Sequence, residues 1–588
     1  MNDRSNAGRE GADRSGSRRL GRRIGVGIAI VLAIVIAFVV RLVDIQVVSA
    51  ATYNAEATAK RDGTATVYST RGSIVDRDGG VLAESVERYD ITASPKVMLG
   101  PGGGAAILPT LEQIADVTGQ EPADLLAVLQ EDPESDYAVL ATGLDLDQYD
   151  RIVALKISGI YGVRVPGRVY PDGQVAGNLV GFLGTDEPLA GIERADDACL
   201  AGTDGVVTYQ RSADGVRIPG TDVVEQPAVD GGTVTLTIDR DLQWFAQERT
   251  QKIMTDLGGT WAASIVVDTT TGEILALADV PTLDPNDFQS ADPSVTGSRS
   301  FSTPYEPGSI MKPFVMAMLL DQGLITPYDQ VNAPYRMDFG PGVGTINDFG
   351  YHKSNLTVAG VLMQSSNTGE AQLSEKMPDA QRYDYYTKFG FGQKTDIDFP
   401  QSAGVMRPAD QWDARTRLNI AFGAGMSATL PQLAQAYLAI ANGGLSEPVS
   451  LVQSCTAPDG TVTAPERPAA QQVISGQAAA TTLSMMEDDQ AFYATTDDVS
   501  IPGYRIASKT GTAYVADSNG YTNQTTISYA AIAPADHPRY VVITSVGLPY
   551  KGNSHLVGAA VRDLLAQALS KNHVAPSTGQ YVQYPMYW

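Results

Sequence analysis

Three short motifs in this 588-residue chain could together supply an acyl-transfer site that works without histidine. Ser309 lies three residues before Lys312, Ser365-Ser366-Asn367 comes next, and the one Lys-Thr-Gly sequence begins at Lys509. Residues three apart on a helix share one face, so Lys312 can approach the hydroxyl of Ser309. A serine hydroxyl becomes a strong nucleophile only when a neighbouring base removes its proton. The sequence therefore predicts a serine nucleophile that is activated by a lysine.

Lys312 can act as that base only if its amine is neutral. A free lysine amine has a pKa near ~10.4, which leaves it protonated at neutral pH. Burial and a second nearby cation both lower the pKa of a lysine, and we expect Lys509 to be the second cation. A shift of about 3 units costs roughly 4 kcal/mol. The pair alone could be a chance match on a surface helix, and the two other motifs make the catalytic interpretation the better one.

The second motif predicts groups that handle a proton and a substrate amide. We expect Ser365 to relay a proton to the leaving amine, and Asn367 to hold both the side chain of Lys312 and an amide of the substrate. Serine and asparagine are also ordinary helix caps, so the tripeptide means little by itself. The backbone N–H groups of Ser309 and Thr512 are the expected oxyanion hole, where each donor is typically worth about 3–4 kcal/mol in the transition state.

The third motif continues a predicted strand and suits the binding of an extended ligand. Gly511 has no side chain, so a ligand backbone can approach the strand edge closely. We expect Lys509 to attract a substrate carboxylate, and we expect Thr510 and Thr512 to donate hydroxyl hydrogen bonds. The alternative is an edge strand whose lysine only discourages aggregation.

A Ser-His-Asp site is the natural competitor for this chemistry. The four histidines of the chain are His352, His537, His555 and His573. No Gly-x-Ser-x-Gly sequence accompanies them, and we expect all four to be incidental. His352 is the one to keep in view, because it precedes the Ser365 segment.

Composition excludes several other classes of function. Two cysteines and four scattered histidines offer no metal-ligand spacing, so we expect neither a metal nor a cofactor. A net charge of -25 disfavours a nucleic-acid partner, because phosphate binding needs a basic surface. Cys199 and Cys455 are far apart in the chain, and their pairing cannot be judged from the sequence. We expect two unpaired thiols.

An apolar run near the N-terminus predicts a membrane helix. Ile24–Val40 contains no charged residue, and five arginines lie between residues 14 and 23. A helix of this length can span a bilayer, and the arginines place the N-terminus in the cytoplasm. We predict a cytoplasmic tail over residues 1–23, one transmembrane helix over 24–43, and a catalytic part outside the plasma membrane. The alternative is a signal peptide cleaved near Val48-Ser49-Ala50, although charged residues make a poor approach to that site.

Strand-like segments at both ends of the second half of the chain predict a single sheet. They are Ala262–Val267, Glu273–Ala278, Tyr504–Ser508, Ser528–Ile532 and Tyr540–Val546. Short links favour antiparallel pairing, and helices must cover both faces of the sheet. We therefore predict an α/β fold with a five-stranded antiparallel sheet in a domain over residues 233–575. An irregular α+β region over 44–232 comes before it, and a C-terminal tail over 576–588 follows.

The three motifs, in this order, match the active-site motifs of penicillin-binding transpeptidases and serine β-lactamases. Further segments make the chain resemble class B penicillin-binding proteins: Arg71–Gly79, Arg168–Gly173, Gly191–Glu193, Val266–Ala276 and Ala441–Gly444. The resemblance implies an elongated pedestal of the dimerisation type and a serine β-lactamase-like α/β/α transpeptidase domain. It also implies that the D-alanyl-D-alanine end of a peptidoglycan stem peptide acylates Ser309, and that β-lactams do so as mimics.

Ser365–Gly369 is closer to division-type (FtsI-like) enzymes than to elongation-type enzymes. The resemblance therefore implies a peptidoglycan D,D-transpeptidase at the division septum, with an elongation-type class B enzyme as the alternative. The region before the catalytic domain resembles no glycosyltransferase. This implies a separate membrane glycosyltransferase partner (FtsW-like) and other divisome membrane proteins.

Two rival functions stay open at this point. A β-lactamase-like hydrolase needs a positioned base that removes the acyl group from the serine, and none can be named in the sequence. A membrane β-lactam sensor needs a signalling domain, for which the N-terminal tail over residues 1–23 is too short.

Overall fold

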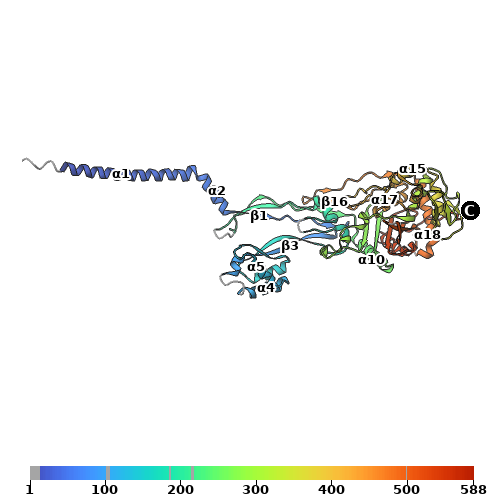
Figure 1. Cartoon of the computed structure of the whole chain (residues 1–588), viewed down its shortest axis with the longest axis horizontal. Coiled ribbons are helices and arrows are strands. Elements are labelled where there is room, and N and C mark those ends of the chain that lie inside the picture. Colours follow the sequence, from blue (N-terminus) through green and yellow to red (C-terminus); the bar gives the residue numbers. More distant parts are fainter. Residues whose placement is uncertain (1–12, 101–105, 185–186, 213–216, 498, 519) are drawn as a thin grey trace, which may run out of the picture. The chain divides into compact units, whose positions relative to one another are not determined.

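The computed structural model describes residues 13–588 except 101–105, 185–186, 213–216, 498 and 519. The chain forms two compact units (Figure 1). One comprises Met1–Tyr68 and Asp204–Ala228, and the other comprises Ser69–Thr203 and Val229–Trp588. The first 12 residues of the predicted cytoplasmic tail lie outside the described residues.

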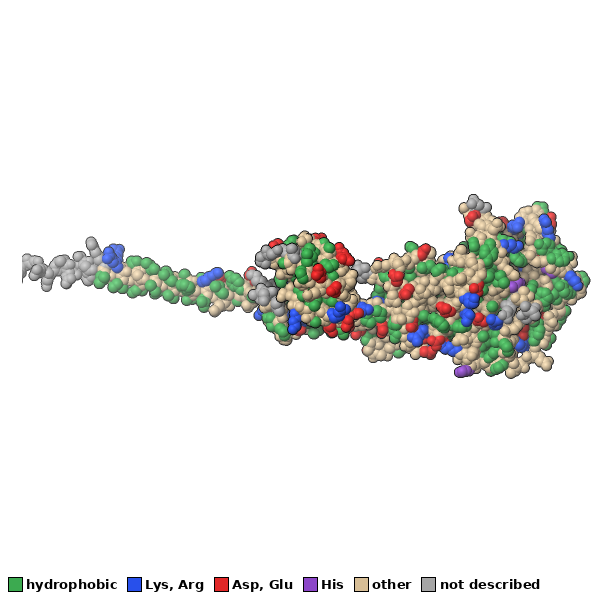
Figure 2. Space-filling model, turned by 90° about the horizontal axis from the view of Figure 1, so that it is seen from below, with side chains coloured by type: hydrophobic (Ala, Val, Ile, Leu, Met, Phe, Trp, Pro, Cys, Tyr) green, Lys and Arg blue, Asp and Glu red, His purple; other side chains and the backbone are tan. Residues whose placement is uncertain are grey.

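In the described part of the chain, the first unit carries one helix that is long and apolar enough to cross a membrane. α1 (Asp13–Val43) continues into a π-helical turn (Asp44–Val48), and the apolar stretch covers Leu20–Val48. No residue of its apolar window is buried, and Figure 2 shows hydrophobic side chains along its length. This helix fits a single-pass membrane anchor.

A small antiparallel sheet completes the first unit. α2 (Ala50–Arg61) leads into β1 (Asp62–Val67), which pairs with β6 (Gly205–Gln210). β6 pairs in turn with β7 (Val223–Gln226), so the order is β1-β6-β7. The unit thus joins the segment after the anchor to a segment much later in the chain.

A seven-stranded sheet in the second unit mixes early and late parts of the chain. Its order is β17-β16-β8-β2-β3-β4, with β5 also paired to β3. The strands are β2 (Ile74–Val75), β3 (Val81–Ala93), β4 (Ala138–Leu144), β5 (Ile160–Val169), β8 (Thr233–Leu236), β16 (Val452–Thr456) and β17 (Val462–Thr463). β8 pairs in parallel with β2 and antiparallel with β16. Segments from both sides of the predicted boundary at residue 232 therefore share one sheet.

Three helices pack beside β3 and β4 around an apolar core of their own. They are α4 (Leu108–Thr118), α5 (Pro122–Glu131) and α6 (Leu146–Ala154). Leu111, Leu125 and Ile152 each contribute a buried side chain from one of them, and Ile91 contributes one from β3. This part confirms the α+β character expected before the catalytic domain.

Cys199 and Cys455 form a disulfide, so the expectation of two unpaired thiols is wrong. Their Cα atoms are 6.1 Å apart, although 256 residues separate them in the chain. The pairing of β16 with β8 places Cys455 opposite Val234, and Gly232 donates its N–H to the carbonyl of Cys199. The two sulfurs meet through long-range strand pairing, which the spacing of the cysteines does not reveal.

The other sheet of the second unit is the predicted five-stranded antiparallel sheet, in the order β10-β9-β21-β20-β19. Its strands are β9 (Trp261–Asp268), β10 (Ile274–Val280), β19 (Ala507–Asp517), β20 (Gly520–Ala533) and β21 (Tyr540–Leu548). The strand expected at Tyr504–Ser508 begins instead at Ala507 and continues to Asp517. It is longer because its bonds to β20 extend through the Lys-Thr-Gly motif and beyond.

Helices cover both faces of this sheet and confirm the three-layer α/β/α arrangement (Figure 1). One face carries α10 (Arg240–Asp256) and α19 (Gly558–Lys571), and the other carries α12 (Lys312–Asp321), α17 (Leu430–Ala441) and α18 (Gly476–Asp497). Neighbouring strand residues face opposite layers, as pleating requires. Ile265 lies in the core of one face and Val266 in the core of the other.

The predicted C-terminal tail over 576–588 packs back onto the second unit. The backbone of β14 (Asn355–Thr357) donates a hydrogen bond to the carbonyl oxygen of Met586 at 3.0 Å. A Cβ at Gly360 would come 2.0 Å from that same oxygen, so this close approach requires glycine. The segment thereby braces α13 (Val358–Met363), which leads into the second motif.

Replacing both cysteines is expected to destabilise the second unit. The double variant Cys199→Ser/Cys455→Ser lacks a cross-link that closes a 256-residue loop, and such a link typically contributes about 2–4 kcal/mol. Calorimetry of the full chain in detergent should show a lower Tm for this variant. A reductant should lower the Tm of the wild type but not that of the variant. Two reactive thiols in the denatured, unreduced wild type would contradict the disulfide.

Candidate active site

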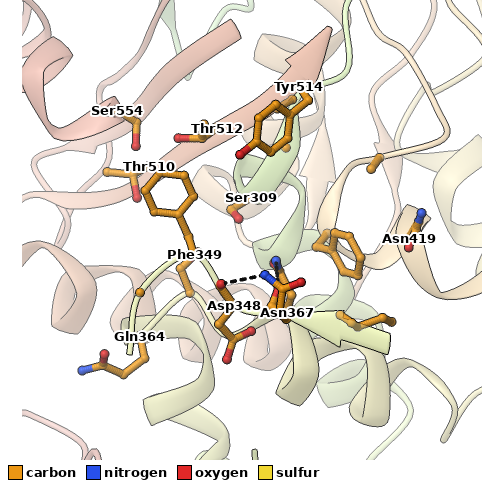
Figure 3. A pocket seen from close by; sticks show the side chains of 18 of the residues that line it. Ser309, Asp348, Phe349, Gln364, Asn367, Asn419, Thr510, Thr512, Tyr514 and Ser554 are labelled. Carbon is orange, nitrogen blue, oxygen red and sulfur yellow. Dashed lines mark hydrogen bonds between the residues drawn. The ribbon is translucent and has the colours of Figure 1, made fainter. Parts of the chain in front are cut away.

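The three motifs meet in one cleft at the edge strand β19 of the five-stranded sheet. The cavity has a volume of about 480 Å³, and the motif residues that line it are Ser309, Ser365, Asn367, Thr510 and Thr512. In Figure 3, Ser309 lies between Thr510 and Thr512 on the strand side and Asn367 on the other side. The structure therefore brings together residues that are distant in the sequence, from Ser309 to Thr512.

Ser309 lies on a tight 3₁₀ turn, η4 (Gly308–Met311), that touches β19. Gly308 has a φ of 62°, and a Cβ there would come 2.7 Å from the carbonyl oxygen of Thr512 and 3.1 Å from its nitrogen. A Cβ at Gly511 would likewise come within 2.8 Å of the backbone that enters this turn. Two glycines thus allow the turn and the strand to approach, which makes the predicted oxyanion donors, Ser309 and Thr512, neighbours.

Lys312 begins α12 and has no exposed surface. Its Nζ donates to the carbonyl oxygen of Ser365 at 2.5 Å and to Oδ1 of Asn367 at 2.8 Å, and it lies 3.3 Å from Oγ of Ser365. Burial lowers the pKa of Lys312 to about 7. The charge of Lys509 acts in the same direction, and the carboxyl group of Glu370 acts against both. The site supplies the burial and the second cation that a lysine base requires.

Lys509 is also fully buried and does not line the cleft. Its Nζ lies 3.2 Å from Oδ1 of Asp489 on α18 and 3.5 Å from Oγ1 of Thr510. A ligand in the cleft would therefore contact the hydroxyl group of Thr510. Lys509 would act on the ligand through its electrostatic potential, without direct contact. The attraction of Lys509 for a substrate carboxylate stays a prediction.

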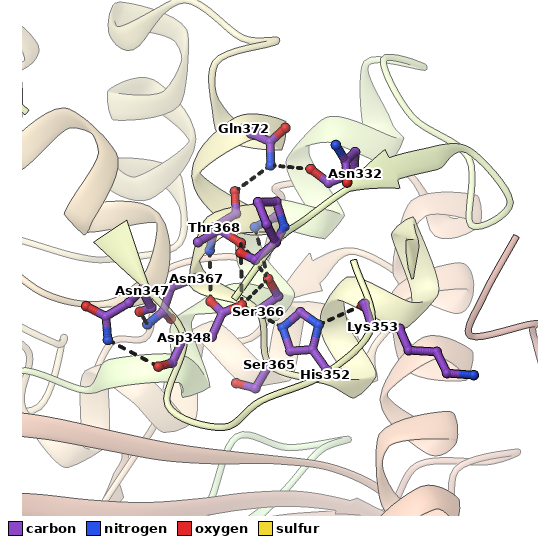
Figure 4. Close-up of polar contacts among 12 residues, drawn as sticks. Asn332, Asn347, Asp348, His352, Lys353, Ser365, Ser366, Asn367, Thr368 and Gln372 are labelled. Carbon is purple, nitrogen blue, oxygen red and sulfur yellow. Dashed lines mark hydrogen bonds and ion pairs between the residues drawn. The ribbon is translucent and has the colours of Figure 1, made fainter. Parts of the chain in front are cut away.

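Ser365 has a φ of 50°, a left-handed backbone conformation that is uncommon for any residue other than glycine. Such strain persists where surrounding bonds hold it in place. Asp348 provides these bonds, because its Oδ2 accepts from Oγ of Ser366 at 2.8 Å and its Oδ1 accepts from the N–H of Thr368 at 3.0 Å (Figure 4). The carboxylate of Asp348 thus fixes the turn that presents Ser365.

His352 holds Asp348 from the other side, a role that its place in the sequence does not reveal. Its Nε2 lies 2.6 Å from Oδ2 of Asp348, and its Nδ1 lies 2.9 Å from the carbonyl oxygen of Lys353 (Figure 4). Both ring nitrogens face acceptors, so the charged imidazolium, which has two N–H donors, fits this setting. The hydrogen bond with Asp348 raises the pKa of His352. His352 therefore supports the second motif, and its two ring nitrogens contact Asp348 and the backbone of Lys353.

Asp348 and Glu370 belong to no recognisable motif. The role of Asp348 depends on contacts that the loop makes after folding, so it could not be predicted from the sequence. The sequence contains one indication for Glu370, because a residue three positions after Asn367 would share its face if the segment were helical. Since Asn367 was expected to hold Lys312, this spacing could have placed Glu370 near Lys312.

The chain matches two protein families. Residues 262–566 match the penicillin binding protein transpeptidase domain, and residues 66–188 match the penicillin-binding protein dimerisation domain. The penicillin-binding protein PbpB of Mycobacterium tuberculosis is 34% identical over 89% of this chain and 80% of its own length. The peptidoglycan D,D-transpeptidase FtsI of Escherichia coli is 29% identical over 89% of this chain and 86% of its own length.

Solved structures extend the likeness to the fold. A peptidoglycan synthetase from Bifidobacterium adolescentis has a TM-score of 0.72 at 32% identity and covers 90% of this chain and 100% of its own. Penicillin binding protein 3 from Mycobacterium tuberculosis, complexed with aztreonam, has a TM-score of 0.68 at 28% identity and covers 89% of this chain and 100% of its own. The likeness therefore includes both matched domains.

The variant His352→Gln is expected to remove a pH-dependent part of the stability. The pKa of His352 is raised in the folded chain. Its charge therefore stabilises the fold fully below the ordinary value of ~6.5, and this contribution disappears as the pH rises through the raised value. At mildly acidic pH, losing one bond of the imidazolium should cost about 1 kcal/mol. Thermal unfolding followed across this range should show the wild type losing its advantage as the pH rises.

A second histidine offers a matched control. His537 also contacts an aspartate and a backbone carbonyl, Asp536 at 3.0 Å and Ala575 at 3.1 Å, but it is exposed and does not line the cleft. His537→Gln should therefore keep the pH-dependent contribution to stability that His352→Gln loses. If the stability difference between His352→Gln and the wild type were the same at every pH, a charged His352 would be ruled out.

Proposed function

The chain belongs to the penicillin-binding protein transpeptidase family, and on this basis we propose that it is a class B peptidoglycan D,D-transpeptidase with its nucleophile at Ser309. The observation that carries the proposal is the buried amine of Lys312, which is bonded to Ser365 and Asn367 beside the cleft that Ser309 lines. The substrate class follows from relatives that are named peptidoglycan D,D-transpeptidases. The enzyme joins stem peptides of the cell wall.

The first half-reaction acylates Ser309. The hydroxyl oxygen of Ser309 attacks the carbonyl carbon of the penultimate D-alanine, and its proton passes to the neutral amine of Lys312. The N–H groups of Ser309 and Thr512 stabilise the carbonyl oxygen as it gains negative charge. Ser365, with its Oγ 3.3 Å from Nζ of Lys312, passes a proton to the nitrogen of the terminal D-alanine as the C–N bond breaks. The products are an ester on Ser309 and free D-alanine.

The second half-reaction transfers the acyl group to a neighbouring stem peptide. An amine of that peptide attacks the ester carbon, loses a proton to Lys312, and the proton returns to the oxygen of Ser309 as the ester breaks. Asn367 holds Lys312 and an amide of the substrate, while Thr510 and Thr512 bind the donor along the strand edge. An exposed strand edge suits an extended peptide, because its backbone groups can pair with the ligand.

The state of the carboxylates in the cleft supports a transferase over a β-lactamase-like hydrolase. A hydrolase needs a base that activates water against the ester. The described lining includes Glu306 and Asp348. Glu306 accepts from the N–H of Gly425 at 2.9 Å and from the hydroxyl of Tyr521 at 3.1 Å. Asp348 is likewise bonded to the second motif. Because both carboxylates already accept hydrogen bonds from the protein, we expect a β-lactam bound to Ser309 to leave slowly.

We further propose that the chain is anchored in the plasma membrane with its N-terminus in the cytoplasm and its catalytic domain outside. The arginines before the apolar stretch support this direction of insertion. The disulfide between Cys199 and Cys455 supports it independently, because disulfides persist in oxidising compartments outside the cytoplasm. Partners would then be a membrane glycosyltransferase (FtsW-like) and other divisome membrane proteins, because the chain's two matched families supply cross-linking and dimerisation only.

Acylation by a fluorescent penicillin tests the reaction. We expect mass spectrometry to find one adduct, on Ser309, in the full chain. Lys312 must be neutral to accept the proton, and its pKa lies near 7. The acylation rate should therefore rise with pH through about 7 and fall about tenfold per unit well below it.

The variant Lys312→Ala should slow acylation by roughly 10²–10⁴-fold, which is the usual contribution of a general base. Lys388→Ala is the matched control, because Lys388 is an exposed lysine that pairs with Asp384 on the protein surface. It should be acylated at the wild-type rate. An adduct elsewhere than Ser309, or near-normal acylation of Lys312→Ala, would refute the assigned roles, and rapid release of the label would favour the hydrolase.

The septal role is tested by the position of the protein in growing cells. A fluorescent protein fused to the cytoplasmic N-terminus should form a ring at the division site, as the naming of the FtsI relatives leads us to expect. A free fluorescent protein expressed at the same level is the control. A signal spread along the side wall during division would favour the elongation-type alternative.

A further inference from the structure

Glu370 is a buried acidic residue that the proposed mechanism does not use. It lies on α14 (Asn367–Ser374) and has no exposed surface. Neither of its carboxyl oxygens has a hydrogen-bond partner. Buried carboxyl groups normally receive several donors, so a group without any requires an explanation.

Glu370 faces the region of the proposed base. It is one helical turn after Asn367, whose Oδ1 accepts from Nζ of Lys312 at 2.8 Å. α14 packs against α12, the helix that Lys312 begins. Two cations act on the carboxyl group of Glu370, namely Lys312 from α12 and Lys509 from β19.

The remaining polar neighbours provide no counter-charge. The phenol of Tyr386 on α15 (Asp379–Lys388) responds to the charge of Glu370, and its hydroxyl is likewise buried without a hydrogen-bond partner. Arg382 on the same helix acts on Tyr386 but is itself paired with Asp379. The cations that act on Glu370 are therefore the two lysines, Lys312 and Lys509.

A carboxylate in this position would be very unfavourable. Removing an anion from water without hydrogen-bond donors strongly favours the neutral acid. Burial raises the pKa of Glu370 to about 8, although Lys312 and Lys509 act in the opposite direction. At neutral pH the group therefore holds its proton. In this state Glu370 adds no negative charge that would help to keep the amine of Lys312 protonated.

We propose that Glu370 is a positioning residue for the acylation reaction: a carboxylic acid stored beside Lys312 whose ionisation makes the lysine a stronger base. The proposal rests on the proposed function of Lys312. When Ser309 attacks, its O–H bond breaks and an N–H bond forms on Lys312, which becomes an ammonium ion. A carboxylate at Glu370 would stabilise this ammonium ion, whereas the neutral acid does not.

The rate of acylation by penicillin should therefore depend on the protonation of Glu370. In the wild type we expect two rises with increasing pH, one as Lys312 loses its proton and a second above about pH 8 as Glu370 ionises. The variant Glu370→Gln keeps the shape of the side chain but stays neutral. It should match the wild type near neutral pH and lack the second rise, ending roughly tenfold slower at alkaline pH.

Two further variants separate charge from packing. Glu370→Met removes both polar atoms at similar length and should show the same single rise as Glu370→Gln, even if one of them folds less well. Glu375→Gln is the control on the same segment, because Glu375 is exposed and pairs with Arg417 at 3.1 Å. It should keep both rises. Identical profiles for the wild type and Glu370→Gln would overturn the proposal. A large loss of rate in Glu370→Gln at neutral pH would overturn it too, because it would mean that Glu370 is ionised there.

Infrared difference spectroscopy provides a readout that needs no reaction. The spectrum of the full chain at neutral pH minus that of Glu370→Gln should contain the C=O stretch of one protonated carboxyl group. This band should disappear as the pH rises past about 8. Its absence at neutral pH would refute the neutral acid. A wild type that shows the band but is not acylated by penicillin would leave Glu370 protonated and refute the proposed function instead.

Discussion

Two lysines with no exposed surface, Lys312 and Lys509, lie close enough to affect each other's charge. Burial disfavours each ammonium group, and like charges repel. The two lysines differ in their bonded partners. Lys509 has an anionic partner, Asp489, at 3.2 Å, whereas the bonded partners of Lys312 are the neutral oxygens of Ser365 and Asn367. Lys312 has no bonded anion and its pKa is lowered to about 7, and it lies three residues after Ser309, the proposed nucleophile.

The rest of the second unit can be understood as support for this unequal pair. Lys312 donates hydrogen bonds to a turn in which Ser365 adopts a left-handed conformation, and Asp348 holds that turn in place. The helix before the turn, α13, is braced by the segment around Met586, which requires Gly360 at the contact. Strand pairing, a strained turn and the C-terminal segment thus all contribute to the surroundings of one amine.

Much of this architecture could be predicted from the sequence, because strands and helices leave local periodic patterns. Four of the five strands lie near their predicted positions, and the motif residues Ser309, Ser365 and Thr510 line one cleft. The disulfide, the role of Asp348 and the burial of Glu370 could not be predicted. Each depends on contacts between segments that are distant in the chain, and such contacts leave no periodic signal. The end of β19 was missed because strand pairing continues where the residues become exposed.

Backbone geometry adds a third influence on Lys312 besides burial and Lys509. Lys312 is the first residue of α12, and its Nζ is bonded to the side chain of Asn367, the first residue of α14. Helix N-termini carry partial positive charge and disfavour a cation. The start of α14, which Asn367 forms, would therefore oppose the ammonium form in the same direction as burial. A replacement such as arginine could not respond in this way, because its guanidinium group stays protonated in proteins. The proposed chemistry thus needs at this position a basic residue that is able to become neutral.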